Sequence, residues 1–281
     1  MMLPNFLVIG GFKCGSRTLC SVLSKHPRLF MSDPQEPHFF SDDSNWSQGL
    51  DYYRSLFPRP EDGFMAVGEG TVYSESTDLS LERIRSVFQS GDLKLIYVAR
   101  HPLERLESAY RHNYLAYGKA LSPFPELILQ KRWFFGSSHF KVCCEWKKAF
   151  GTDNLYPVLF EDLVSDPLAV ARSCFEFLGL DPDVDLDFEN RAYNNSGDRA
   201  ARTKLTGLES SRFLRMAIPK AWRPKLRNLA VEFLGKRVQD PAIWSAESLS
   251  FACHELESDA HTFLKSLGRD PGLWAFPHRT I

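Results

Sequence analysis

The chain has 281 residues, of which 43% are hydrophobic, and a formal net charge of −1. This length and composition suit a single domain over residues 1–281, with a helical C-terminal part over about 205–281 packed on it. The balanced charge excludes a protein that binds polyanions by bulk charge, although eleven basic residues against two acids give residues 199–237 a charge of +9.

The cysteines and the apolar segments indicate the compartment. The six cysteines include no C-x-x-C pair, and in a chain of this length they favour reduced thiols of an intracellular protein. The N-terminus lacks the basic segment of a signal peptide, and no stretch approaches the roughly 18 apolar residues of a membrane helix. We therefore expect a cytoplasmic protein without a membrane span. A luminal fragment of a membrane-anchored Golgi enzyme is the less favoured alternative.

The first half of the chain alternates between short apolar runs and segments with helical spacing. Residues 6–9 form an apolar run that ends at two glycines, which predicts a strand buried on both faces of a parallel sheet. Residues 17–25 then carry apolar side chains at helical spacing. A second buried strand is predicted over residues 95–99. A helix over 103–117 follows a proline, which is typical of a first helical turn.

Later segments continue this alternation and then become helical. Residues 155–160 predict a weaker third strand, placed at an edge or a bulge by Pro157. Further helices are predicted over residues 167–178, 208–217, 223–237 and 246–266. Strands that alternate with helices imply an α/β fold, with a P-loop-like parallel β-sheet flanked by helices and a helical C-terminal region.

A glycine-rich segment, Gly10-Gly-Phe-Lys-Cys-Gly-Ser-Arg-Thr18, joins the first predicted strand to the first predicted helix. The backbone N–H groups of such a loop and the partial positive charge of the helix N-terminus favour an anion. Lys13 adds a full charge, and Ser16 and Thr18 add hydroxyl donors. A Walker A loop would place a magnesium-binding hydroxyl directly after its lysine, so this loop predicts phosphate binding without a metal. The alternative is a glycine-rich turn with a solvated lysine.

This loop and later segments resemble the PAPS-dependent sulfotransferases, whose donor is 3′-phosphoadenosine-5′-phosphosulfate (PAPS). Residues 10–19 match the family's loop, G-x-x-K-x-G-T/S-T/R-x-L, at every fixed position. Lys94-Leu-Ile-Tyr-Val-Ala-Arg100-His-Pro, followed by Ser108, is similar to the family's 3′-phosphate site, and residues 160–167 resemble its E-D-L…D-P segment. Two more segments, Gln35-Glu-Pro-His-Phe-Phe40 and residues 49–58, resemble the heparan sulfate O-sulfotransferases and their bacterial relatives.

The resemblance implies which residues bind the nucleotide. The glycine-rich loop would hold the 5′-phosphosulfate, Arg100 and Ser108 would bind the 3′-phosphate, and a late loop at 194–202 would close over it. The implied cofactor-binding residues are Lys13, Cys14, Gly15, Ser16, Arg17, Thr18, Arg100, Ser108, Ser196, Arg199 and Arg202. The alternative for Arg100 is a salt bridge at the end of the sheet, and for the late loop it is an exposed basic surface.

Two residues are the predicted catalytic groups. Sulfuryl transfer needs a cation at the leaving phosphate oxygen and a base for the acceptor proton. Lys13 is the predicted cation, and Glu36 is the predicted base through its match to a glutamate of the heparan group. His38 is the rival base, because a histidine serves that role in the cytosolic branch of the family. The alternative for His38 is a partly buried imidazole without a catalytic role.

One position departs from the heparan pattern. That group has E-K-T-P after its tyrosine-rich segment, and its lysine acts at the reacting centre. Here Glu69 and Thr71 remain, but the lysine is replaced by Gly70. The departure leaves Lys13 as the main predicted cation and argues against a heparan-type acceptor.

The acceptor is predicted less closely than the donor. Residues 110–135 contain seven aromatic side chains beside Lys131 and Arg132, a combination that suits a hydroxyl or amine of a sugar or glycan. The alternative is that most of these rings belong to the helix core. Competing functions are a P-loop nucleotide kinase and a non-catalytic nucleic-acid-binding protein, but neither a magnesium ligand nor a nucleic-acid motif supports them. We expect PAPS and an acceptor as partners, with no metal, no nucleic acid and no membrane span.

Overall fold

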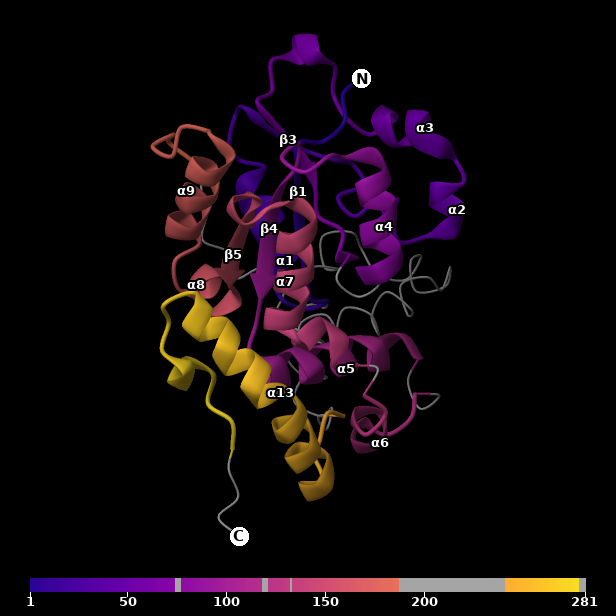
Figure 1. Cartoon of the computed structure of the whole chain (residues 1–281), viewed down its shortest axis with the longest axis vertical. Helices are drawn as coiled ribbons and strands as arrows, with labels where there is room; N and C mark the ends of the chain where they lie inside the picture. The colour runs from indigo at the N-terminus through magenta and orange to yellow at the C-terminus, as the bar shows by residue number, and fades with distance from the viewer. Residues whose placement is uncertain (74–76, 118–120, 132, 187–240, 278–281) are drawn as a thin grey trace, which may run out of the picture.

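The computed structural model describes residues 1–73, 77–117, 121–131, 133–186 and 241–277 (Figure 1). Within these residues, five parallel strands form one sheet in the order β2-β3-β1-β4-β5. The strands are β1 (Phe6–Gly10), β2 (Leu29–Met31), β3 (Ala66–Glu69), β4 (Lys94–Ala99) and β5 (Leu155–Leu159).

Helices connect the strands and cover the sheet. The α-helices are α1 (Ser16–Leu23), α2 (Asp43–Trp46), α3 (Gly49–Ser55), α4 (Thr77–Val87), α5 (Pro102–Tyr117), α6 (Phe124–Ile128), α7 (His139–Phe150), α8 (Phe160–Ser165), α9 (Pro167–Leu178) and α13 (Ala246–Ser266). Short 3-10 turns are η1 (Pro60–Asp62), η4 (Phe135–Ser137), η5 (Thr152–Asn154) and η6 (Pro271–Trp274).

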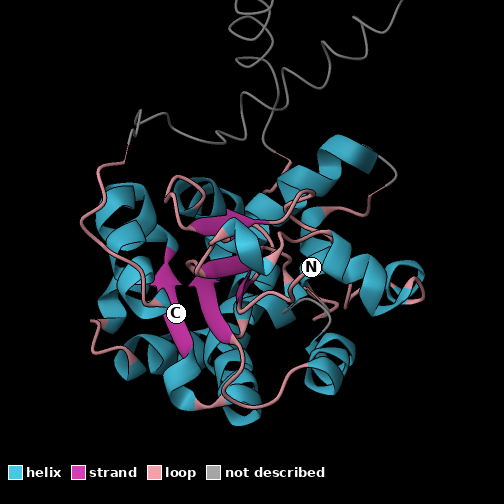
Figure 2. Cartoon of the chain, turned by 90° about the horizontal axis from the view of Figure 1, so that it is seen from above, coloured by secondary structure: helices cyan, strands magenta, loops and turns pink. Residues whose placement is uncertain are grey.

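Strand β1 shows why the sheet is buried on both faces. Phe6 and Val8 pack into one apolar cluster with α1 and α9, whereas Leu7 and Ile9 pack into another with α4, α7 and α13. Successive side chains of a strand point to opposite faces, so a continuous apolar run requires a layer of helices on each side. Figure 2 shows this arrangement, with the strands in the middle and helices around them.

The order of the strands produces a topological switch point at β1. From β1 the chain passes to β2 and β3 on one side, then crosses through α4 to β4 on the other side. In parallel α/β sheets, ligands bind outside the carboxyl ends of the strands at such a switch point. The segments that follow β1, β3 and β4 therefore converge where a ligand site is expected.

The structure confirms the α/β prediction and most of its elements. The three predicted strands are β1, β4 and β5, with Pro157 in the edge strand β5, and four predicted helices are α1, α5, α9 and α13. The sequence did not predict β2, β3, α4 or α7. The helices predicted over 208–217 and 223–237 lie outside the described residues.

The C-terminal helix α13 is fixed to the rest of the fold by polar contacts. Arg269, just beyond α13, donates two hydrogen bonds to Asp162 of α8, at 2.6 and 2.9 Å. Asp259 of α13 accepts hydrogen bonds from the backbone N–H groups of Phe140 (3.0 Å) and Lys141 (2.9 Å), in the first turn of α7. Asp259 therefore satisfies N–H groups that have no partner within α7 itself.

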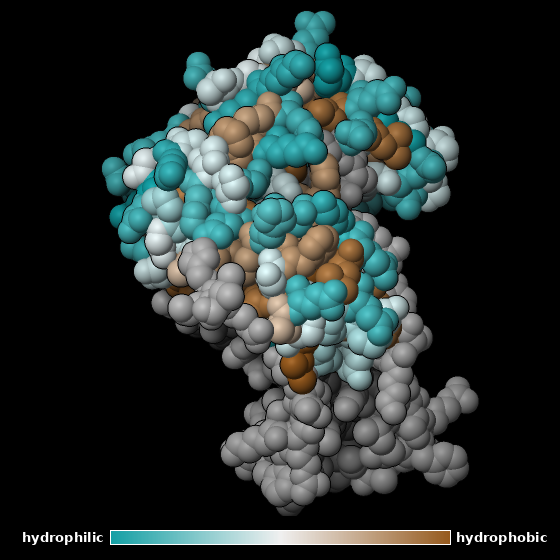
Figure 3. Space-filling model, turned by 60° about the horizontal axis from the view of Figure 1, so that its bottom comes forward, coloured by the Kyte–Doolittle hydropathy of each residue, from teal (hydrophilic) through white to brown (hydrophobic). Residues whose placement is uncertain are grey.

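Three further features describe the surface, the helices and the cysteines. On the face shown in Figure 3, hydrophobic residues lie in small groups among hydrophilic ones. No helix in the described part of the chain has the length and apolarity to cross a membrane. All six cysteines carry free thiols.

The Asp259 contact yields the first prediction. Asp259→Ala removes a helix-capping acceptor from α7 and should lower the free energy of unfolding by about 1–2 kcal/mol in urea denaturation. Asp153→Ala, the same change at an exposed residue of a short turn, should stay within about 0.5 kcal/mol of the wild type. Equal stability of the two variants would contradict the capping role.

Candidate active site

The loop between β1 and α1 is shaped by close packing against β4 and α8. A Cβ on Gly10, whose φ is +140°, would lie 2.2 Å from the carbonyl oxygen of Val98. A Cβ on Gly15, whose φ is +98°, would lie 2.7 Å from the ring of Phe160. Only glycine fits both positions, and the compact loop leads directly into the N-terminus of α1, where helix N–H groups favour an anion.

Two cations belong to this part of the site: Lys13 lies within the loop, and Arg105 contacts the loop from α5. Lys13 is half-buried, has a φ of +73° and places its Nζ 5.8 Å from the ring centroid of Phe12. Arg105 of α5 is only 2% exposed and donates hydrogen bonds to the carbonyl oxygens of Phe12 (3.2 Å) and Trp133 (2.7 Å). A buried guanidinium thus holds the backbone directly before Lys13 and adds positive charge behind the loop.

Other predicted loop residues have different environments. Cys14 is buried, and its backbone N–H donates to the carbonyl oxygen of Gly11 at 3.1 Å. Ser16, 7% exposed, is the first residue of α1, and Thr18 is partly buried in the same turn. Ser16 and the amides of the first turn are therefore placed to face a bound anion, whereas the Cys14 amide is already used within the loop.

Arg100 follows the end of β4 and lies beside the loop. Its guanidinium carbon is 4.4 Å from the ring centroid of Phe160, the same ring against which Gly15 packs. Its Nη2 donates to Glu104 at 2.9 Å, whereas its buried Nε has no hydrogen-bond acceptor among the described residues. Ser108 lies further along α5 and is 9% exposed. A buried guanidinium N–H without an acceptor fits a ligand that carries a phosphate.

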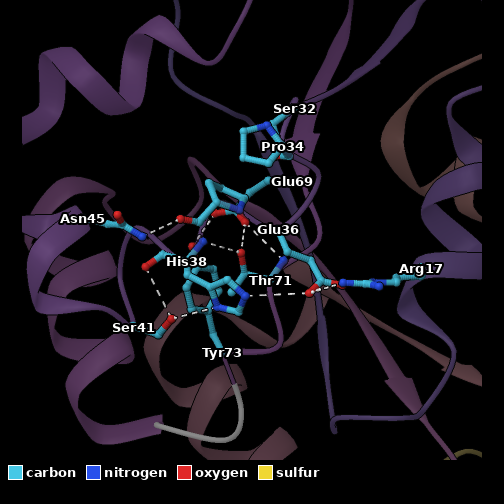
Figure 4. A network of polar contacts seen from close by, with 11 residues as sticks. Arg17, Ser32, Pro34, Glu36, His38, Ser41, Asn45, Glu69, Thr71 and Tyr73 are labelled. Atoms are coloured by element: carbon cyan, nitrogen blue, oxygen red, sulfur yellow. Dashed lines mark hydrogen bonds and ion pairs between the residues drawn. The ribbon is translucent and has the colours of Figure 1, made fainter. Parts of the chain in front are cut away.

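Arg17, Glu36 and His38 form a polar network at the other side of the loop (Figure 4). Arg17 donates to both carboxylate oxygens of Glu36, from Nε at 2.6 Å and from Nη2 at 3.2 Å. The Nε2 atom of His38 lies 3.7 Å from Oε2 of Glu36. The two candidate bases and a cation that was predicted to bind the cofactor therefore meet in one cluster.

The network sets the protonation states of both candidate bases. Burial alone would raise the pKa of Glu36, but the contact with His38 and the hydrogen bonds and charge of Arg17 outweigh it and lower this pKa to about 2. The close contact with the Glu36 carboxylate raises the pKa of His38 above its usual range. Glu36 is thus a carboxylate at neutral pH, held between two groups that stabilise its negative charge.

A second carboxylate, that of Glu69, is buried and supports this network through hydrogen bonds. Glu69, at the end of β3, accepts hydrogen bonds from the hydroxyls of Tyr53 (2.9 Å), Tyr73 (2.5 Å) and Thr71 (2.5 Å). The Thr71 hydroxyl oxygen also accepts the backbone N–H of His38 at 3.2 Å. Glu69 thereby fixes Thr71, and Thr71 fixes the segment that carries both candidate bases (Figure 4).

Gly70 occupies a tightly packed position between this network and α1. A Cβ at residue 70 would lie 2.6 Å from Sγ of Cys20, which is itself buried. A side chain here requires a shift of Cys20 or of α1, so the glycine is part of the local packing. The lysine that the heparan pattern has at this place cannot simply be substituted into this fold.

The predicted site residues divide into three groups. The loop residues follow β1, and Arg100 and Ser108 follow β4. Glu36 and His38 follow β2, so both of these groups lie beyond the carboxyl ends of parallel strands. Ser196, Arg199 and Arg202 lie outside the described residues. Among the described residues, no three His, Cys, Asp or Glu side chains are grouped to hold a metal ion.

The aromatic segment predicted for the acceptor contributes mainly to the core. Tyr110, Phe124 and Phe134 are buried there, and Tyr114, Trp133 and Phe135 pack against it. Arg105 was not predicted as a site residue, because a lone charge in an apolar segment does not reveal its partners. Glu69 was matched to the heparan pattern, but its role as a buried acceptor of three hydroxyl hydrogen bonds was not predicted. The tyrosines of residues 49–58 were a usable signal, since a buried acid needs several hydroxyl donors.

Comparison with known proteins adds the family. A model of the sulfotransferase domain family matches residues 3–246. Human heparan sulfate glucosamine 3-O-sulfotransferase 6 is 31% identical over 188 residues, which are 63% of this chain and 52% of that protein. Mouse heparan sulfate glucosamine 3-O-sulfotransferase 5 is 28% identical over 194 residues, which are 65% of this chain and 55% of that protein. The chain thus spans about half the length of these curated relatives.

A solved structure gives the same result for the fold. The sulfotransferase from Alicyclobacillus acidocaldarius is 25% identical, with a TM-score of 0.57, and the match covers 79% of this chain and all of that one. The family match covers most of the chain, including the glycine-rich loop, the Glu36 network and Arg100. This chain therefore belongs to the sulfotransferase domain family.

Proposed function

We propose that this protein transfers the sulfuryl group of PAPS to a hydroxyl, or alternatively an amine, of a sugar or glycan. The observation that carries the proposal is the Phe160 ring, which contacts both the glycine-rich loop at Gly15 and the guanidinium of Arg100. Two anion-binding elements that share one side chain suit a nucleotide with phosphates at both its 5′ and 3′ positions. The loop takes the phosphosulfate, and Arg100 with Ser108 takes the 3′-phosphate.

Lys13 supplies the cation for the transfer. As the bond between the acceptor oxygen and sulfur forms, the bond from sulfur to the bridging phosphate oxygen breaks, and negative charge builds on that oxygen. Lys13 stabilises this charge together with the amides at the start of α1. Arg105 maintains the loop in the required conformation through the carbonyl oxygen of Phe12.

Glu36 receives the acceptor proton. In the free protein, both oxygens of its carboxylate accept hydrogen bonds from Arg17, so the carboxylate is a weak base in that state. The sulfuryl group beside the loop is a competing anion for Arg17, and loss of the Arg17 contact raises the basicity of Glu36. His38 stays beside Glu36 as a second partner and orients it.

The relatives and the local sequence bear differently on the acceptor. The curated relatives are named as heparan sulfate glucosamine 3-O-sulfotransferases, which supports a sugar hydroxyl as the acceptor group. Gly70, packed against Cys20, replaces the lysine of the heparan pattern. We therefore propose a glycan acceptor other than heparan sulfate, one that reacts without this additional lysine at the reacting centre.

Nucleotide selectivity tests the donor. At a hundredfold excess over Kd, 3′,5′-ADP should stabilise the protein by about 2.7 kcal/mol and raise Tm by several degrees without magnesium. ADP and ATP should give smaller shifts, because they lack the 3′-phosphate that Arg100 binds. A larger shift with Mg·ATP would indicate a kinase, and a response to oligonucleotides that collapses with salt would indicate a nucleic-acid-binding protein.

The role of Lys13 is tested by Lys13→Ala in a transfer assay with radiolabelled PAPS and a panel of glycans. Loss of the cation should reduce kcat by about 10²–10³, whereas binding of 3′,5′-ADP persists in part through Arg100. Lys25→Ala, at an exposed position beyond the end of the same helix, is the control and should keep wild-type activity. Full activity of Lys13→Ala would remove Lys13 from the mechanism.

The pH profile distinguishes the two candidate bases. A base works in its deprotonated form, above its pKa, and the pKa of Glu36 is about 2 in the free protein. With Glu36 as base, kcat/KM should change little from pH 8 to pH 5. With His38 as base, whose pKa is raised, kcat/KM should fall about tenfold for each pH unit below that pKa.

Two variants accompany the profile. Glu36→Gln should bind 3′,5′-ADP normally but lose transfer, whereas His38→Ala should keep measurable transfer. The opposite result, with Glu36→Gln active and His38→Ala inactive, would identify His38 as the base.

A further inference from the structure

The backbone of Arg100 is held by a histidine that the proposed chemistry does not use. His139, in the first turn of α7, is fully buried, and its Nε2 lies 2.8 Å from the carbonyl oxygen of Arg100. Its Nδ1 lies 2.9 Å from the hydroxyl of Tyr97, on β4. Both ring nitrogens are therefore used, one by β4 and one by Arg100, the residue directly after β4.

The partners of His139 define its tautomer. A backbone carbonyl only accepts hydrogen bonds, so Nε2 carries the proton and donates to Arg100. Burial lowers the pKa of His139 to about 3, so the ring is neutral and Nδ1 accepts from the Tyr97 hydroxyl. One ring orientation satisfies both contacts, because turning the ring over would put carbon-bound hydrogens in the places of Nε2 and Nδ1 and remove both hydrogen bonds.

Neighbouring contacts restrain the rest of this junction. The backbone N–H of His101 donates to Oε1 of Glu161 at 3.0 Å, and its Nε2 lies 3.1 Å from the carbonyl oxygen of Ala275. The ring of Trp274 packs 5.4 Å from the ring of His139, between centroids. The carbonyl of Arg100 and the amide of the next residue are thus held by α7 and α8, with the C-terminal segment packed beside them.

We propose that His139 is a positioning residue which, through the carbonyl of Arg100, directs the Arg100 guanidinium and so sets the selectivity for nucleotides that carry a 3′-phosphate. The inference rests on the proposed function, in which Arg100 binds that phosphate. A paired guanidinium and phosphate require a fixed geometry, and rotation of the Arg100 peptide plane would displace the whole side chain. In the proposed function the glycine-rich loop binds the 5′ end of the nucleotide, so the affinity for 5′-AMP serves as the reference for that end.

The test compares two amide variants of His139. The side-chain nitrogen of Gln reaches the place of Nε2, whereas that of Asn reaches only the place of Nδ1. Both replace the imidazole by a buried amide, so they carry a similar cost in folding and differ in their reach to Arg100. The measured quantity is the ratio of the Kd of 5′-AMP to the Kd of 3′,5′-ADP, by calorimetry on the full chain.

The expected result is a loss of selectivity in one variant only. His139→Gln should keep the wild-type ratio, and His139→Asn should lower it by about threefold to tenfold, the loss of one hydrogen bond, with the Kd of 5′-AMP unchanged. Arg100→Ala marks the ratio without any 3′-phosphate contact. Thermal unfolding without nucleotide reports the stability of each variant separately.

The possible outcomes separate the inference from the proposed function. Equal ratios in the Gln and Asn variants, beside a wild type that prefers 3′,5′-ADP, would overturn the role of His139 alone. A parallel loss of affinity for both nucleotides would also overturn it, because a purely structural role predicts that result. A wild type without preference for 3′,5′-ADP would overturn the assignment of Arg100 and the inference with it.

Discussion

The contact of Phe160 with two functional segments organises the site. Its ring contacts both Gly15 and the Arg100 guanidinium, so the loop after β1 and the end of β4 have a fixed separation. The parallel register of β1 and β4, which pairs Gly10 with Val98, sets the same relation through the backbone. The glycines are required at this place, because any Cβ would force β4 or α8 away from the loop. The anion-binding groups are therefore positioned by packing, before any ligand contributes.

Buried polar groups fix each functional segment from behind. Arg105 holds the backbone before Lys13, and Glu69 holds the segment of Glu36 and His38 through Thr71. Each buried group is costly unless its hydrogen bonds are satisfied, so each is stable in one arrangement only. Burial raises the pKa of Glu69, whereas its hydroxyl donors oppose that effect. The positions of the reactive side chains are thus set by buried residues, which hold the backbone segments that carry them.

The sequence predicted the segments that have a local pattern and missed those defined by distant contacts. β1 and β4 are continuous apolar runs, and the loop motif follows β1 directly, so both were predictable. β2 has only three residues, and β3 contains Gly68, which packs against the ring of Phe6, so neither has a strand-like pattern. The contacts of Arg105 and Glu69 involve residues from several elements, and only the folded chain brings these together. The role of Arg17 as a partner of Glu36 was likewise invisible in a motif that assigns it to the nucleotide.

The Arg17–Glu36 pair connects donor binding to acceptor activation in the proposed reaction. Arg17 belongs to α1 and follows the loop that takes the phosphosulfate, whereas Glu36 belongs to the segment beyond β2. An anion at the loop and the Glu36 carboxylate compete for the same guanidinium, so their binding to Arg17 is thermodynamically coupled. Without a donor, the Glu36 carboxylate is ionised and paired with Arg17, so its affinity for a proton is low. With the donor bound, Arg17 is drawn toward the sulfuryl group and Glu36 gains basicity, so the base is strongest when a sulfuryl group is ready to be transferred.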